Sequence, residues 1–261
     1  MFCCLFAAAL LGIAGQNGLV PSPTETAKAL PPGGNVPSTP AADHKQPLTR
    51  EMRGDIFMAR KMFREAVEQY KLAPQSANID NKIGIAYHQL QDLRTAKKYY
   101  QLAIHENRTY PDAINNLGTV YYSEKSYRRA ISQYKKALKI APRSATIYSN
   151  LGSAYFSRKD YEHAMENYNI ALSLDPQVFE HRGTTGVLLQ ERSVEDKAMY
   201  YYFMARVYAK QGDNDDALQY IRKALEVGFK DRRKFQENPD FAGLQKLPEF
   251  QQLMNTEQRV L

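Results

Sequence analysis

Apolar side chains between residues 113 and 140 recur at the spacing of two successive amphipathic helices. In 113–125 they are Ile114, Leu117, Val120 and Tyr121, which fall at i, i+3, i+6 and i+7 and share one helical face. The segment 127–140 has the same periodicity, with Tyr127, Ala130, Ile131, Tyr134, Ala137 and Leu138 on one face. Pro142 follows, and because proline does not continue a helix, the pattern predicts that the second helix ends there.

This helical pattern returns every 34 residues. Gly84, Gly118 and Gly152 keep that step. So do four further classes: Tyr87, Tyr121 and Tyr155; Ala96, Ala130 and Ala164; Tyr100, Tyr134 and Tyr168; and Ala103, Ala137 and Ala171. A fixed period of this length indicates a stack of repeated helix pairs, which usually serves as an extended binding surface. The small residues let paired helices approach closely, and the tyrosines fill the gaps between them.

The repeated residues resemble the tetratricopeptide repeat (TPR). One unit matches with Asn116, Leu117, Gly118, Tyr121, Tyr127, Ala130, Tyr134, Ala137 and Pro142, and a second unit has the same residue types 34 positions later. The unit around Gly84 departs from the pattern, with Arg108 in place of the closing proline. The resemblance implies an all-α fold, a right-handed superhelix of antiparallel helix pairs with about five repeats.

We expect repeats at about 48–76, 77–110, 111–144, 145–176 and 198–228, which form a TPR domain over 48–228. An insertion loop at 177–193 precedes the last repeat, where Ser193 and Asp196 resemble a helix-capping box. Residues 229–261 resemble the helices that close bacterial TPR arrays. As a C-terminal helical cap, they would cover the apolar face of the last repeat.

The N-terminal segment is different in composition. Residues 2–14 are almost wholly apolar, too short to cross a membrane, which needs ~20 residues, and typical of a secretory signal over 1–15. No base precedes them, and a short disordered tail is the alternative. Residues 16–47 are proline-rich and predict a disordered linker. We therefore expect a periplasmic or cell-envelope protein that meets the membrane only during export, with a cytoplasmic location as the alternative.

The formal net charge of +7 belongs to the repeat region, because residues 1–46 contain as many acids as bases. Six bases gather in and just after the second helix of the third repeat: Arg128, Arg129, Lys135, Lys136, Lys139 and Arg143. Such a cluster is either a patch for nucleic acid or an anionic surface, or the solvated outer face of the array. We favour the solvated face, because exposed helix faces are routinely charged.

Residue types that carry out catalysis are not arranged for it in this sequence. The five histidines show no metal-ligand spacing, and no phosphate-binding glycine loop or nucleophile motif occurs. The only cysteines are Cys3 and Cys4. We therefore expect no enzymatic activity, no small-molecule substrate, no cofactor and no metal.

The TPR resemblance also implies a binding site, because the first helix of each pair lines a concave groove. Carried over residue by residue, the peptide-binding positions are Asn81, Lys82, Asn115, Asn116, Thr119, Tyr122, Ser149, Asn150, Ser153 and Phe156. Asn116 and Asn150 stand one repeat apart, and an amide can both donate to and accept from a peptide backbone. The alternative is that these asparagines face solvent or bond to a neighbouring helix.

The sequence thus predicts a non-catalytic scaffold or adaptor that binds an extended peptide or a partner helix. Cell-envelope assembly, pilus biogenesis and secretion are processes in which exported TPR proteins commonly act. The alternative function is nucleic-acid or anionic-surface binding through the basic outer helix faces. Export disfavours nucleic acid as a partner, and the sequence does not name the protein partner.

Overall fold

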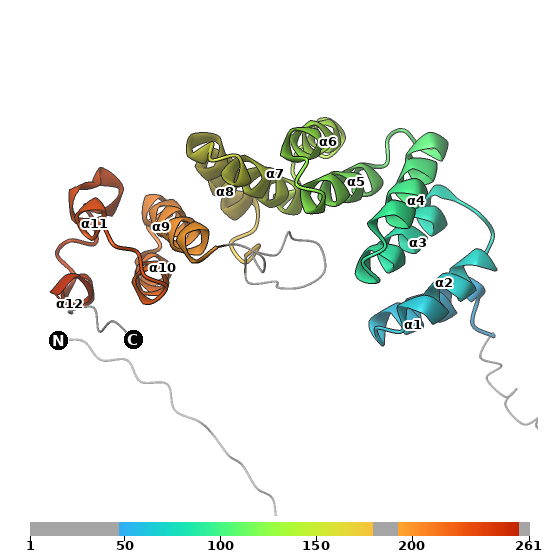
Figure 1. Ribbon diagram of the computed structural model, residues 1–261, viewed down its shortest axis with the longest axis horizontal. Coiled ribbons are helices and arrows are strands. Elements are labelled where there is room, and N and C mark those ends of the chain that lie inside the picture. The colour runs from blue at the N-terminus through green and yellow to red at the C-terminus, as the bar shows by residue number, and fades with distance from the viewer. Residues whose placement is uncertain (1–46, 180–192, 256–261) are drawn as a thin grey trace, which may run out of the picture. The chain divides into compact units, whose positions relative to one another are not determined.

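The computed structural model describes residues 47–179 and 193–255. Throughout these residues the regular structure is helical, with twelve α-helices, one 3₁₀ helix and no strand (Figure 1). The predicted all-α class is therefore confirmed. The signal-like segment, the linker up to residue 46 and residues 180–192 of the predicted insertion lie outside the described residues.

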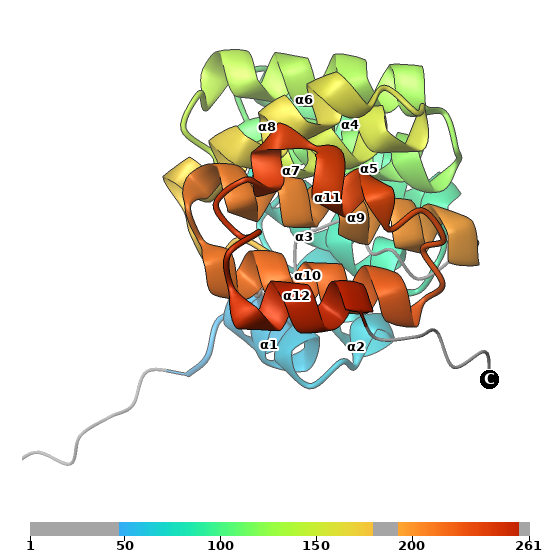
Figure 2. The same ribbon diagram turned by 90° about the vertical axis from the view of Figure 1, so that its left-hand side faces the viewer.

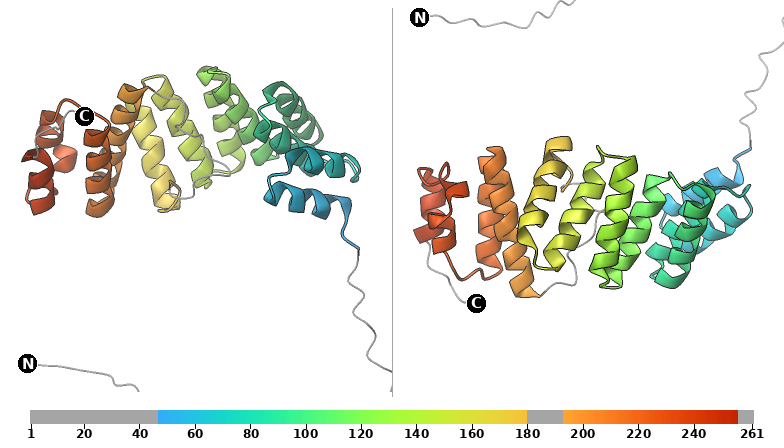
Figure 3. Two further views of the ribbon diagram at one scale, coloured as in Figure 1. Left: turned by 60° about the horizontal axis from the view of Figure 1, so that its bottom comes forward. Right: turned by 90° about the horizontal axis from the view of Figure 1, so that it is seen from above.

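Ten of these helices form five consecutive antiparallel pairs. The pairs are α1 (Arg50–Ala59) with α2 (Phe63–Lys71), α3 (Ala77–Gln89) with α4 (Leu93–Glu106), α5 (Pro111–Ser123) with α6 (Tyr127–Ile140), α7 (Ala145–Ser157) with α8 (Tyr161–Leu174), and α9 (Val194–Gln211) with α10 (Asn214–Glu226). Each second helix also packs against the first helix of the next pair (Figure 3). Every pair therefore buries apolar surface against its neighbours as well as within itself.

The recurring glycine of each first helix faces the recurring tyrosine of the second. A Cβ atom built on Gly118 would lie 2.6 Å from the Tyr134 ring, far inside van der Waals contact, and Gly84 stands in the same relation to Tyr100. The Tyr134 side chain is completely buried. The absence of a side chain at Gly118 is thus what gives the ring its space. The predicted close approach of the paired helices is present in this form.

The turn inside each pair uses a residue in the left-handed backbone conformation. The residues are Lys61 (φ 59°), Gln91 (62°), Lys125 (56°), Lys159 (62°) and Gly212 (80°). In the third pair the Ser126 amide then donates to the Tyr121 carbonyl over 2.8 Å, which satisfies a helix-end acceptor. One positive φ per repeat is what reverses the chain over so few residues.

The helices after residue 228 cover the last pair. They are α11 (Arg233–Glu237), the 3₁₀ helix η1 (Pro239–Phe241) and α12 (Pro248–Asn255), which pack on α9 and α10 (Figure 2). Phe235 and Phe241 are completely buried, and Tyr202 of α9 contacts both rings. Arg206 of α9 pairs with Asp240 over 2.7 Å. The predicted C-terminal helical cap is confirmed.

Candidate interaction site

The predicted peptide-binding residues all come from α3, α5 and α7, and these first helices contact one another in sequence order. We call the polar side chains of α1, α3, α5 and α7 that meet along this row the first-helix face. The structure brings the predicted residues together there. It also shows that most of them already have hydrogen-bond partners.

Lys82 of α3 is bound to two carboxylates of α1. Its Nζ lies 2.8 Å from Glu51 and 2.7 Å from Asp55, and only a quarter of its side chain is exposed. Burial by itself lowers the pKa of Lys82, but the hydrogen bonds to Asp55 and Glu51 outweigh this and hold the pKa above its usual value. Lys82 therefore links the first two repeats and carries a charge that is already neutralised.

The asparagines bond from one repeat to the next. The Asn116 amide donates to Asn81 Oδ1 over 3.0 Å, and the Asn150 amide donates to Asn115 Oδ1 over 3.0 Å. Asn81, Asn115 and Asn150 are buried, Asn150 completely. Of the two interpretations left open by the sequence, the bond to a neighbouring helix is therefore the one present. The prediction of Asn150 as a peptide-binding residue is corrected, because first helices one repeat apart approach closely enough to enclose its amide.

The hydroxyl groups of these helices are also hydrogen-bonded. Thr119 donates to the Asn115 carbonyl over 3.2 Å, and the Tyr122 and Ser157 hydroxyls lie 2.8 Å apart. Ser153 is buried, with its hydroxyl 3.1 Å from that of Tyr168. The first contact lies within α5, the second joins α5 to α7, and the third joins α7 to α8. They hold these side chains in fixed positions, so polar groups meet a ligand without a further ordering cost.

Phe156 is among the predicted peptide-binding residues, and the structure corrects this prediction. Its side chain is 3% exposed and lies among the rings of Tyr161, Tyr200 and Phe203. The aromatic residues of α9 reach it because α9 packs on α8, a contact that no local pattern in α7 indicates. Phe156 is therefore part of the core.

Five predicted residues keep some exposed surface on the first-helix face. They are Lys82, Asn116, Thr119, Tyr122 and Ser149. Sequence reasoning missed three residues that belong to the same network: Glu51, Asp55 and Tyr110, whose hydroxyl accepts from the Asn81 amide over 3.3 Å. The two acids could have been found, because they are spaced i, i+4 on the helix one repeat before Lys82.

The described residues contain no group of three or more His, Cys, Asp or Glu side chains that could hold a metal ion. Over the same two stretches of chain, none of the helices combines the length and the apolar character that a membrane crossing requires.

Family models match this chain at four places. Models described as tetratricopeptide repeats match residues 81–110, 145–178 and 198–228, and one described as a TPR repeat matches 118–157. No curated protein matches the sequence.

Solved structures with a similar arrangement include MamA proteins. A crystal structure of MamA is 22% identical with a TM-score of 0.46, covering 69% of this chain and 96% of that one. MamA from Desulfovibrio magneticus RS-1 is 19% identical with a TM-score of 0.47, covering 68% and 92%. A chain of the APC/C hetero-tetramer Cut9-Hcn1 is 19% identical with a TM-score of 0.50, covering 70% of this chain and 33% of that one. At these identities the likeness concerns the fold alone. With its paired antiparallel helices, the chain contains tetratricopeptide repeats over residues 81–110, 118–178 and 198–228.

Proposed function

We propose that the protein is a non-catalytic adaptor that holds an extended peptide or a partner helix along its first-helix face. TPR proteins are protein-interaction scaffolds, so the open question is which surface is used. The observation that carries the proposal is the row of partly exposed polar groups on adjacent helices, from Lys82 on α3 through Asn116 and Tyr122 on α5 to Ser149 on α7. Because bonds between repeats fix Asn116 and Tyr122, a ligand meets donors and acceptors that are already positioned.

The buried asparagines narrow this proposal. The buried residues Asn81, Asn115 and Asn150 link the first helices, so their role is structural and they are not accessible to a partner. Contact with a partner then falls to the five partly exposed residues of the face, from Lys82 to Ser149. A peptide bound there would gain most from hydrogen bonds, each worth ~0.5–1.5 kcal/mol.

A substitution that blocks the face without disturbing the core tests this proposal. Ser149 is partly exposed on α7, and Ser149→Arg places a long charged side chain on the first-helix face. Ser173→Arg is the matched control, because Ser173 is exposed on the second helix α8. Proteins captured from the native host by the full chain are identified by mass spectrometry, and their affinities for both variants are then measured. Loss of a partner with Ser149→Arg alone supports the proposal, whereas loss with Ser173→Arg alone contradicts it.

Export is a further part of the proposal. It rests on the apolar run at residues 2–14, and a role in cell-envelope assembly, pilus biogenesis or secretion depends on it. Removal of the run would leave a mature protein without cysteine, because Cys3 and Cys4 are the only cysteines. Intact-mass measurement on protein from the native host decides the matter. A cytoplasmic species that retains both cysteines would rule export out.

A further inference from the structure

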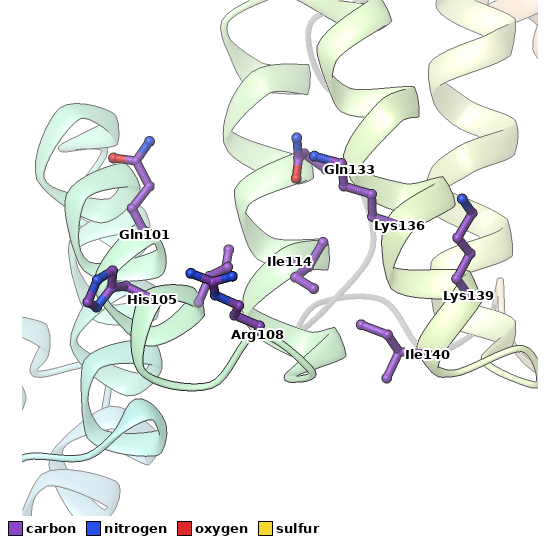
Figure 4. Close-up of a pocket in the computed structure, with 9 residues that line it drawn as sticks. Gln101, His105, Arg108, Ile114, Gln133, Lys136, Lys139 and Ile140 are labelled. Carbon is purple, nitrogen blue, oxygen red and sulfur yellow. The ribbon is translucent and has the colours of Figure 1, made fainter.

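A groove lies between the second helices of the second and third repeats, away from the first-helix face. Its volume is about 570 Å³, within the range of ~300–1,000 Å³ that is usual for ligand pockets. Figure 4 shows side chains that line it from α4, α5, α6 and the turn before α5. We call it the α4–α6 groove; its lining residues are Gln101, Ile104, His105, Arg108, Ile114, Gln133, Lys136, Lys139 and Ile140.

The groove combines an apolar base with a basic rim. Ile104 and Ile114 lie at its base, because α5 packs against both α4 and α6. Ile140 at the end of α6 is 37% exposed and adds an apolar side chain to the rim of the groove. Arg108, Lys136 and Lys139 are exposed beside these residues, and within the described part of the chain no carboxylate pairs with any of them.

The two second helices that border the groove are more basic than the one that follows them. α6 contains five Lys or Arg residues and no acid, and α4 contains three with a single acid, Glu106. The next second helix, α8, contains two glutamates and neither Lys nor Arg. Of the eight bases of α4 and α6, Lys136 and Lys139 line the groove, and Arg108 adds a third base from the turn before α5.

The corresponding positions one repeat later lack the same chemistry. Counting 34 residues on, Lys136 and Lys139 correspond to Ile170 and Ser173, and Ile114 corresponds to the much larger Tyr148. An ordinary solvated helix face has no apolar base. An ordinary contact between two repeats has its space filled by side chains. The α4–α6 groove is neither.

We propose that the α4–α6 groove is a second docking surface, which binds an acidic amphipathic helix of a partner protein. Apolar side chains at i, i+3 or i+4, and i+7 of such a helix would enter between the isoleucines, and flanking Glu or Asp would pair with Arg108, Lys136 and Lys139. Nucleic acid fits less well, because among the described residues that line the groove His105 is the only one with a ring, and none is a Phe, Tyr or Trp to stack with a base. The proposal uses other helices than the first-helix face and does not depend on it.

The test uses the full chain and a synthetic peptide of about 15 residues, long enough for four helical turns. The peptide has Leu at helical spacing on one face and Glu beside it, and a scrambled peptide has the same composition without an apolar face. Fluorescence anisotropy measures Kd. We expect the ordered peptide to bind with an affinity that falls as salt is added, and the scrambled peptide to bind at least about tenfold more weakly.

Charge-reversal variants locate the binding. Lys136→Glu with Lys139→Glu should raise Kd at least about tenfold. Lys98→Glu with Arg128→Glu is the matched control, because it makes the same change in net charge on exposed positions of α4 and α6 outside the groove. We expect it to raise Kd no more than about twofold. Equal weakening by both pairs would mean general electrostatic attraction and would overturn the proposal.

The variant Ile140→Ser distinguishes binding of the amphipathic peptide from binding of other anionic ligands. Because Ile140 is partly exposed at the end of α6, this change should leave the fold intact, which circular dichroism verifies. It should weaken the ordered peptide several-fold and leave the weaker binding of a polyuridine RNA unchanged. The proposal fails if RNA or anionic lipid vesicles bind more tightly than the peptide through Lys136 and Lys139. It also fails if the peptide does not bind, or if the groove instead joins two copies of the chain in sedimentation experiments.

Discussion

Tyr134 and its equivalents depend on a missing side chain in the opposite helix. In four repeats a glycine faces a tyrosine, and the fifth repeat replaces both residues: Ala205 stands at the glycine position and Ile221 at the tyrosine position. Both are completely buried. The smaller Ile leaves room for the Ala methyl group, so the two positions are coupled through the volume that they share.

This coupling can be measured in the third repeat. Gly118→Ala should cost ~1–3 kcal/mol of unfolding free energy, because the new Cβ meets the Tyr134 ring, and this outweighs the ~1 kcal/mol that Ala gains over Gly in helix propensity. Combining it with Tyr134→Ile should recover at least ~1 kcal/mol relative to the sum of the two single changes. Urea unfolding of all four proteins tests this. Strictly additive effects would show that the two sites do not share space.

A second residue-scale prediction concerns the buried amide. Asn150→Ala should destabilise the protein by ~1–3 kcal/mol, because Asn115 Oδ1 loses its donor inside the structure. Ser149→Ala, on the adjacent and partly exposed position, should change stability by less than ~0.5 kcal/mol. Thermal unfolding followed by circular dichroism measures both. If Asn150→Ala unfolds like the parent, the amide is not a structural link.

At the scale of elements, the turn within each pair sets how the two helices face each other. Four of the five turns place Lys or Gln in the left-handed conformation, which costs a residue with a side chain roughly 1–2 kcal/mol. Only the fifth pair uses glycine, at Gly212. The sequence periodicity marks the helices well, but these turn residues are unremarkable in type, so their backbone conformation follows from the packing of the helices on either side.

Relief of this strain is predicted to stabilise the protein. Lys159→Gly should raise the free energy of unfolding by up to ~1 kcal/mol, because glycine adopts positive φ without a steric penalty. The adjacent Arg158 has φ of −90°, so Arg158→Gly should give no gain. Differential scanning calorimetry compares the three melting temperatures. A lower melting temperature for Lys159→Gly than for the parent would contradict the prediction.

For the molecule as a whole, the buried tyrosines of the repeats make the free energy of unfolding decrease at alkaline pH. Burial raises the pKa of both Tyr100 and Tyr134 well above the value of a free tyrosine. In the unfolded chain these groups lose their protons near pH 10, whereas the folded chain retains them to higher pH. The contribution of these tyrosines to the free energy of unfolding is therefore fully present below about pH 10 and is lost as the pH rises above that value.

The expected loss is about 1.4 kcal/mol per pH unit for each such tyrosine. Denaturant unfolding at a series of alkaline pH values measures the slope. Tyr134→Phe removes one ionising group and should make the slope shallower by one proton equivalent. A parent and a variant with the same slope would show that Tyr134 ionises equally in both states.

The order of helices was predictable from sequence because the same small and large residues recur every 34 positions, at the places where paired helices pack. Gly118 and Tyr134 recur with their neighbours, and each class of position has one physical role in every repeat. The C-terminal phenylalanines were predictable for a related reason, since an array needs its last apolar face covered. These features follow from local pattern and from the rule that apolar faces are buried.

The exposure of the candidate site was decided only by the tertiary structure. Asn116 and Asn150 look alike in sequence, yet Asn150 is completely buried and Asn116 is partly exposed. From the sequence, Lys82 is a candidate to bind a partner, but in the structure it pairs with Glu51 and Asp55 of α1. The α4–α6 groove likewise requires two second helices and, beneath them, Ile114, which is smaller than the Tyr148 at the same position of the next repeat. A repeat pattern specifies which residues face a neighbouring helix, whereas the distance and the side chains met there depend on both elements together.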